Sequence, residues 1–287
     1  MSYYISKLFS HIICLLPNNV NRNIGNILGE LTWLIVPEKR KKMAVNNILQ
    51  CLQVTPTEAA NIAKKSWTRF GRMIIELLLY PKIKKNIDQY VTLEGKENLE
   101  KALSCGKGVV LATSHSGNWE IMGAALALNG FPLNVMAQKQ SNQNMDRFIN
   151  EYREMMGIHV SYKTSMRAVI RLLAKGTVIG MLMDQDAGND GVILDFFGRK
   201  TSCAKGTAFL AHLNTAPIVP IFITENQDGK HTLLIKEPLF IEQTEDKQHD
   251  IEKMTEHLTK LIENHIRQYP EEWFWLHDRW KSVEDRD

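Results

Sequence analysis

The stretch Val109-Val110-Leu111-Ala112-Thr113-Ser114-His115-Ser116-Gly117-Asn118-Trp119-Glu120 decides the fold, because the local structure changes within it. Its apolar beginning, residues 109–112, is typical of a buried strand, whereas residues 119–128 have the composition of a helix. The turn between them is polar, and Ser116 or Asn118 can cap the helix that follows. A strand, a turn and a helix in this order form the repeating unit of α/β folds.

The same alternation continues towards the C-terminus. Further strands are expected at 133–137, 158–162, 178–183, 218–224 and 232–235, and further helices at 144–156, 204–213 and 251–266. Asp228-Gly229 between two of these strands indicates a hairpin. The segment 184–203 is rich in Gly and Asp, and we expect a loop there.

Residues 1–90 contain only helical patterns. We therefore predict an α/β fold with a central, mainly parallel or mixed sheet flanked by helices, preceded by a helical N-terminal membrane-associating extension. The expected division is a helical region at 1–90 and an α/β domain at 91–287, packed as one unit.

Composition excludes several classes of protein. The chain has 287 residues, of which 44% are hydrophobic and 23% charged, so disorder and fibrous repeats are excluded. The net charge is +3, but residues 1–90 carry 13 Lys/Arg against 5 Asp/Glu, and the remainder is acidic. A basic first third predicts an anionic partner: anionic lipid, an acidic protein or nucleic acid. The net charge itself argues against a general nucleic-acid coat.

The cysteines are Cys14, Cys51, Cys105 and Cys203. They are scattered and form no C-x-x-C pair, so neither a zinc motif nor a disulfide framework is indicated.

The N-terminus carries two apolar segments. Residues 8–21 lack Lys, Arg, Asp and Glu, but they are too few to span a bilayer, which takes about 20 residues. The second segment, 24–36, has helical spacing and precedes the basic run 39–42. Apolar helices beside basic residues suit a helix that lies in a membrane surface. A core helical hairpin with a solvated basic loop is the alternative.

The polar turn also carries a candidate for acid–base chemistry. His115 lies in the turn and Glu120 in the first turn of the expected helix, where the two side chains can meet. A carboxylate on one imidazole nitrogen leaves the other nitrogen free as a base. No G-x-S-x-G nucleophile motif is present, so direct attack of a substrate hydroxyl on an activated acyl group is the economical reaction.

Three blocks of this sequence resemble a known family. His115-Ser-Gly-Asn-Trp-Glu120 looks like the H-x4-[DE] motif of the lysophospholipid-acyltransferase superfamily, closest to the bacterial lipid A biosynthesis (lauroyl/myristoyl) acyltransferases. Asp184-Gln185 with Phe196-Phe197-Gly198-Arg199 resembles a second block, and the stretch from Pro270 to Lys281 resembles a C-terminal signature. The similarity covers nearly the whole chain.

The resemblance implies transfer of a fatty acyl chain from acyl carrier protein to a hydroxyl of a Kdo-bearing lipid A precursor. It implies action at the cytoplasmic face of the inner membrane, with His115 as base and Glu120 as its orienting partner. No metal, no cofactor beyond the carrier thioester and no acyl-enzyme are expected. Nucleic acid then drops out as a partner, and we expect a monomer.

The remaining candidate site residues are expected to contact substrate. They are Ser114, Asn118, Arg153, Asp184, Gln185, Arg199 and Thr201. By the resemblance, Arg153 could hold a phosphate or the thioester carbonyl. Gln138 stands where family members often have Arg, with Lys139 next to it. Near the C-terminus, Arg279 could contact the carrier or a headgroup, whereas three tryptophans (Trp273, Trp275 and Trp280) are expected to pack in the core.

Two alternatives remain open at this stage. One is an acyl-CoA-dependent acyltransferase that acts on another glycolipid or a lysophospholipid, such as a phosphatidylinositol mannoside. The other is a lipid-binding protein on the same scaffold, which the intact His115/Glu120 pair disfavours.

Overall fold

A computed structural model describes residues 2–162 and 166–284 and confirms the α/β fold. Its main sheet has the strand order β1-β9-β8-β2-β5-β3-β4. The strands are β1 (Val91–Glu94), β2 (Val109–Thr113), β3 (Leu133–Ala137), β4 (His159–Tyr162), β5 (Val178–Leu182), β8 (Ile218–Glu225) and β9 (His231–Ile235). Every neighbouring pair in this sheet is parallel except β8 with β9, so the sheet is mainly parallel, as expected.

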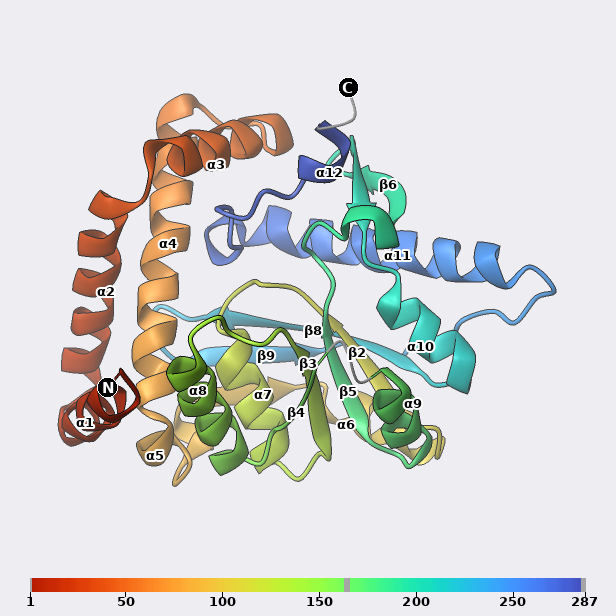
Figure 1. Ribbon diagram of the computed structural model, residues 1–287, viewed down its shortest axis with the longest axis horizontal. Coiled ribbons are helices and arrows are strands. Elements are labelled where there is room, and N and C mark those ends of the chain that lie inside the picture. Colours follow the sequence, from red (N-terminus) through yellow and green to blue (C-terminus); the bar gives the residue numbers. More distant parts are fainter. Residues whose placement is uncertain (1, 163–165, 285–287) are drawn as a thin grey trace.

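Helices surround this sheet (Figure 1). They are α1 (Ser2–Leu15), α2 (Asn18–Ile35), α3 (Glu38–Cys51), α4 (Pro56–Leu78), α5 (Tyr80–Ile83), α6 (Lys96–Ser104), α7 (Trp119–Leu128), α8 (Gln143–Met155), α9 (Met166–Ala174), α10 (Gly206–Asn214), α11 (Lys247–Gln268) and α12 (Lys281–Glu284). Short 3₁₀ turns lie at Ile87–Gln89, Gly188–Asp190 and Pro270–Glu272. Figure 1 shows α2 and α4 standing side by side next to the sheet, with α11 crossing above it.

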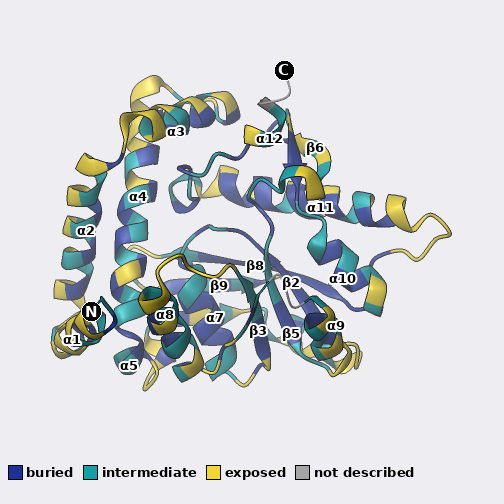
Figure 2. Ribbon diagram, viewed as in Figure 1, coloured by how far each residue is buried: buried dark blue, intermediate teal, exposed yellow. Residues whose placement is uncertain are grey.

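The sheet separates two hydrophobic cores, because successive side chains of a strand point to opposite faces. On one face Val109 and Leu111 pack with residues of α6 and α7. On the other face Val110 and Ala112 pack with residues of α9, α10 and α11. The central strand β2 is buried on both faces, which explains why it is a continuous apolar run rather than an alternating one, and Figure 2 shows the buried centre of the sheet.

The N-terminal helices pack closely because glycines face each other. Gly29 of α2 lies so near α4 that an added Cβ would sit 2.6 Å from Thr68 Cα. Gly71 of α4 is equally tight, since its Cβ would lie 2.8 Å from the carbonyl oxygen of Gly25. The backbones of α2 and α4 therefore meet directly, and the larger side chains of α2 are left on its outer side.

One local expectation was wrong. The segment 184–203 contains a hairpin, β6 (Val192–Phe196) paired antiparallel with β7 (Arg199–Cys203). Its residues alternate weakly in burial, and the turn uses Phe197 in a left-handed conformation (φ 59°), which no Asn-Gly or Asp-Gly pair announces. The alternative of a solvated basic loop at 39–42 does not hold either, because these residues lie at the start of α3, which begins after Pro37.

Within residues 2–162 and 166–284, no helix is both long enough and apolar enough to cross a membrane.

Candidate functional site

His115 and Asp184 are brought together by the pairing of β2 with β5. Thr113 at the end of β2 lies opposite Leu182 at the end of β5, so the residues that follow emerge side by side at one sheet edge. His115 Nδ1 lies 2.9 Å from Asp184 Oδ1, and the His115 backbone N–H donates to the same oxygen at 3.0 Å. This is the edge at which open α/β sheets place their ligands.

Trp273 completes the environment of the carboxylate. Its indole N–H donates to the second oxygen of Asp184 at 2.7 Å, and both residues are buried. Burial alone raises the pKa of the Asp184 carboxyl, but the His115 ring and the hydrogen bonds from His115 and Trp273 outweigh it and lower that pKa below its usual value. Asp184 is therefore an anion that three N–H groups hold in one orientation.

The ionised carboxylate fixes the tautomer of the imidazole. A carboxylate only accepts hydrogen bonds, so Nδ1 of His115 carries a proton, and in the neutral ring the lone pair is on Nε2. Among the described residues no hydrogen bond engages Nε2, and the His115 side chain is 20% exposed. The geometry is that of a general base open to substrate.

Glu120 is not the residue that orients His115, which corrects the expectation from sequence. Both oxygens of Glu120 bind Arg153, at 3.0 Å to Nε and 2.5 Å to the terminal Nη2 nitrogen. Burial lowers the pKa of the Arg153 guanidinium, but Glu120 raises it and prevails. The side chain of Glu120 therefore reaches α8, which carries Arg153, rather than the His115 ring.

The turn that carries His115 is joined to the C-terminal segment by backbone hydrogen bonds. The Gly117 N–H donates to the carbonyl of Glu272 at 2.9 Å, and the Phe274 N–H donates to the carbonyl of His115 at 3.0 Å. Gly117 has φ +64°, and an added Cβ would lie 2.2 Å from the carbonyl oxygen of Ile223. Only glycine fits this position without strain.

Asn118 ends the turn and starts the helix. Its side-chain oxygen accepts from the N–H groups of Glu120 and Ile121, which makes it the N-cap of α7. Its side-chain nitrogen donates to Glu76 of α4, which also binds His231 Nε2 at 3.0 Å. Asn118 is buried and serves the scaffold rather than the substrate.

An aromatic wall stands next to the imidazole. Trp119 meets the His115 ring edge-on, with ring centroids 4.9 Å apart. Phe70 of α4 stacks on Trp119 and also contacts Phe274, at centroid distances of 6.3 and 5.3 Å. Trp67 extends the same wall along α4. These half-buried rings give the site an apolar side.

The other expected substrate contacts fall into two groups. Ser114 is buried beside His115 and its hydroxyl lacks a partner among the described residues, and Gln185 follows Asp184 half-buried. Thr201 is fully buried and both donates to and accepts from Arg279, whereas Arg199 stacks on Trp280 and binds Asn47. The structure thus places Thr201 and Arg199 in the scaffold that holds the C-terminal segment.

The C-terminal signature is mostly interior. The three tryptophans are buried, as expected. Arg279 is buried too, at 1% exposure, and binds Thr201, Ser202 and Cys203 of β7. It is therefore not a surface contact for a carrier or a headgroup.

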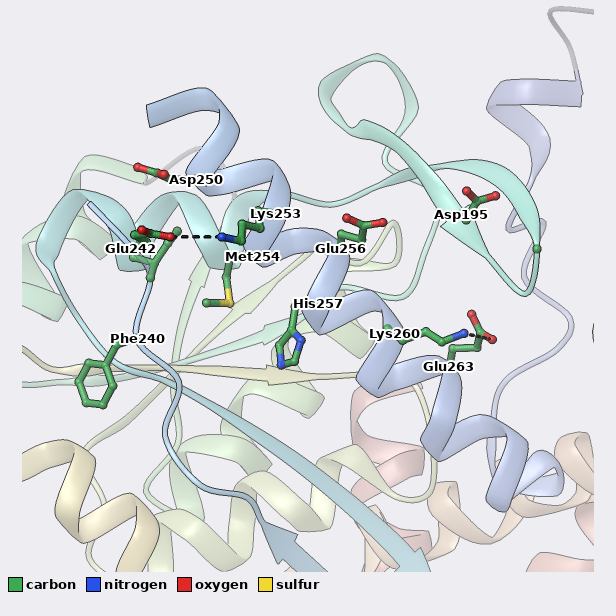
Figure 3. A pocket seen from close by; sticks show the side chains of 12 residues that line it. Asp195, Phe240, Glu242, Asp250, Lys253, Met254, Glu256, His257, Lys260 and Glu263 are labelled. Carbon is green, nitrogen blue, oxygen red and sulfur yellow. Dashed lines mark hydrogen bonds and ion pairs between the residues drawn. The ribbon is translucent and has the colours of Figure 1, made fainter. Parts of the chain in front are cut away.

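A large hollow lies away from His115, along α11. It has a volume of about 770 Å³ and follows α11, where Phe240, Met254 and His257 line it together with several charged side chains (Figure 3). Two ion pairs, Lys253 with Glu242 and Lys260 with Glu263, occupy much of its rim. None of the predicted site residues lines it.

Sequence reasoning missed the roles of several residues at the site. Trp273 was assigned to the core, which is correct, but its indole N–H also positions Asp184. The aromatic residues from α4, Trp67 and Phe70, lie 48 and 45 residues upstream of His115 and have no local signal except their helical spacing. The position of Trp273 in the C-terminal signature was the one clue available.

Comparison with known proteins agrees with the family resemblance of the three sequence blocks around His115, Asp184 and Trp273. A family profile described as bacterial lipid A biosynthesis acyltransferase matches residues 1–282. A phosphatidylinositol mannoside acyltransferase of Mycolicibacterium smegmatis is 29% identical, over 64% of this chain and 60% of the relative. The lipid A biosynthesis palmitoleoyltransferase of Escherichia coli is 22% identical over 93% of this chain and 87% of its own length, and the lauroyltransferase of the same organism is 23% identical over 94% and 88%. The match thus spans under two thirds of the mycobacterial relative but nearly all of the two enterobacterial ones. The profile match covers almost the whole chain, and the protein belongs to the bacterial lipid A biosynthesis acyltransferase family.

Proposed function

We propose that this protein is an O-acyltransferase that moves a fatty acyl chain from an acyl carrier protein thioester to a hydroxyl of a Kdo-bearing lipid A precursor. The observation that carries the proposal is the His115–Asp184–Trp273 arrangement at the sheet edge, with Nε2 of His115 open to substrate. Such a base takes a proton from a hydroxyl during attack on an activated acyl group.

The proposed reaction needs one proton carrier. The acceptor hydroxyl oxygen attacks the thioester carbonyl carbon while His115 Nε2 takes the hydroxyl proton, and Asp184 stabilises the resulting imidazolium. A carbon–oxygen bond forms, the carbon–sulfur bond breaks, and the imidazolium returns the proton to the leaving thiolate. His115 therefore carries the proton from the hydroxyl to the thiolate, and the reaction needs no acyl-enzyme.

The aromatic wall favours a donor substrate that carries an apolar acyl chain. Trp67, Phe70, Trp119 and Phe274 border the imidazole on one side, and apolar groups gain about 25 cal/mol for each Å² removed from water. We propose that this wall contacts the first part of the acyl chain. We also propose that the Arg153 guanidinium, which is paired with Glu120, meets a phosphate of the acceptor.

The second candidate acceptor is a phosphatidylinositol mannoside. The relative with the highest identity named above is an enzyme of that kind, although the match covers only part of it. Both acceptors present a sugar hydroxyl beside anionic phosphate, so the site geometry serves either. Product identity decides between them.

The test is a product analysis by mass spectrometry. Purified protein is incubated with a mixed pool of acyl carrier protein thioesters, or with acyl-CoA, and with the Kdo-bearing precursor or phosphatidylinositol mannoside. The expected result is one added acyl ester on the Kdo-bearing precursor with the carrier donor, and none with the His115→Ala protein. Acylation of the mannoside alone supports the second candidate, and no acyl transfer from any donor refutes the enzyme proposal.

The outer sides of α1 and α2 support a peripheral site of action on the cytoplasmic face of the inner membrane. Exposed large apolar side chains gather on both helices: Tyr4, Ile5, Leu8, Phe9, Ile12, Leu15, Val20, Ile27, Leu31, Leu34 and Ile35. A surface this rich in apolar residues marks an interaction site. The basic first turn of α3 follows directly, and each Lys or Arg near an anionic leaflet contributes about 1 kcal/mol. We propose that these helices lie on anionic membrane and that Lys39 and Lys42 are also available to the acidic carrier.

A vesicle flotation assay tests this surface. Leu8→Asp combined with Leu15→Asp is expected to weaken binding to phosphatidylglycerol-containing vesicles at least about tenfold, because each buried leucine contributes roughly 1.5–3 kcal/mol. Leu213→Asp, an exposed leucine on α10, is the matched control and is expected to bind like the unmodified protein. Equal flotation of the α1 variant and the control contradicts the proposal.

A further inference from the structure

The catalytic carboxylate stands on a loop that the C-terminal segment holds in place. Asp184 is bound by Trp273, and two residues further on the N–H of Asp186 donates to His277 Nε2 at 3.1 Å. Ser282 donates to the Asp186 carboxylate as well. The stretch 273–282 therefore makes contacts with both ends of the loop 184–186.

The same stretch holds the other half of the site. The carbonyl of His115 accepts from Phe274, and the carbonyl of Phe274 accepts from the N–H of His277 at 3.4 Å. Hydrogen bonds through Phe274 thus connect His277 to His115. The hydrogen bond to Asp186 connects His277 to Asp184, two residues earlier in the chain. Neither connection belongs to the β2–β5 pairing that brings the two strand ends together.

His277 can make its contact in one protonation state only. A backbone N–H needs a lone pair, so Nε2 must be unprotonated and the neutral ring must carry its proton on Nδ1. Protonation of Nε2 replaces the acceptor by a second donor and leaves the Asp186 N–H without a partner. It also adds a positive charge close to His115.

The surroundings of His277 favour the neutral ring at neutral pH. The charged groups that face it are Asp184, Asp186, His115 and Arg279. Burial lowers the pKa of His277, His115 and Arg279 lower it further, and Asp184 and Asp186 raise it, with a net shift below the usual 6.5. Because the pKa is lowered in the folded protein, the contact is present above the shifted value and is lost as the pH falls through it.

We propose that His277 is a positioning residue for acyl transfer: its unprotonated Nε2 holds the Asp184 loop, and its protonation loosens that loop as an acid-sensitive switch. The inference rests on the proposed roles of His115 and Asp184. His277 acts through Asp186 and Asp184, so its loss affects the alignment of the base rather than the binding of the thioester.

The test compares two substitutions of His277. Gln places an amide oxygen near the position of Nε2 that accepts a hydrogen bond but does not take up a proton in this pH range, whereas Leu offers no acceptor. We expect His277→Leu to lower kcat about tenfold or more with KM for the thioester little changed, and His277→Gln to retain kcat within about threefold at neutral pH. The acid limb of the His277→Gln profile should be less steep than that of the unmodified protein, because one proton fewer is taken up.

His265→Gln is the matched control. His265 is another buried histidine, whose pKa burial lowers to about 4, and its ring stacks on Phe222. Its ring contacts Phe222 and Tyr269 rather than residues 184–186, so its replacement is expected to leave the pH profile unchanged. Circular dichroism of each variant shows whether the fold is retained.

A measurement independent of activity completes the test. In ¹⁵N-histidine spectra at neutral pH, the resonance that disappears in His277→Gln should report a neutral ring with its proton on Nδ1. A proton on Nε2, or acid limbs that coincide for the unmodified protein and His277→Gln, overturns the inference. If His115→Ala still transfers acyl groups, the proposed role of His115 as base fails instead, and if the unmodified protein transfers none, the proposed function fails; neither result changes the ring state of His277.

Discussion

We expect Asp184→Asn to lower kcat for acyl transfer by about 10³- to 10⁴-fold, close to the loss caused by His115→Ala. The carboxylate accepts from three N–H groups, and an amide in its place presents an NH₂ to one of them. The His115 ring then loses the anion that holds its proton on Nδ1, so Nε2 is no longer fixed as the acceptor. The substitution preserves shape, so the loss is expected without a large change in stability.

Two further variants make this prediction specific. Because His115 and Asp184 act as a unit, the double variant is expected to be no slower than either single one. Glu120→Gln leaves the His115–Asp184 contact in place and removes only the negative charge that pairs with Arg153. It is therefore expected to have a clearly smaller effect on kcat. Steady-state rates with a carrier thioester provide the measurement. A larger loss for Glu120→Gln than for Asp184→Asn would falsify the assignment of Asp184.

Gly117→Ala is expected to destabilise the protein by about 2–5 kcal/mol and to abolish acyl transfer. A left-handed backbone costs a non-glycine residue about 1–2 kcal/mol, and here the new Cβ also meets the carbonyl oxygen of Ile223 at 2.2 Å. Two backbones must separate to relieve this clash, and overpacking of that kind costs about 1–3 kcal/mol more. The turn that moves is the one that carries His115.

Gly106→Ala separates the two causes. Gly106 has φ +70°, close to the +64° of Gly117, but an added Cβ finds nothing within 4 Å. We expect Gly106→Ala to lose only the cost of the backbone conformation, about 1–2 kcal/mol, and to keep its activity. Urea unfolding midpoints measure both variants. Equal destabilisation of the two proteins would show that the approach of Ile223 to Gly117 is unimportant.

The sequence alone was sufficient for the fold class and for the position of His115. Both depend on local information: an apolar strand, a capped turn and a helix follow one another within residues 109–128, and their periodicity is visible in the chain. The helical N-terminal third and the hairpin at Asp228-Gly229 are local in the same sense, and the structure has both. The β6–β7 hairpin was missed because its turn lacks such a signal.

Only the tertiary structure decided which carboxylate serves His115. Glu120 is the near neighbour in sequence, but the helix directs it to Arg153. Asp184, almost seventy residues away, reaches the ring because β5 lies beside β2 in the sheet, an arrangement that no local pattern specifies. Trp273 and His277 then fix that carboxylate and its loop from the far end of the chain. A hydrogen bond is set by distance and direction in space, and residues that are distant in sequence acquire both only when the sheet and its C-terminal segment have assembled.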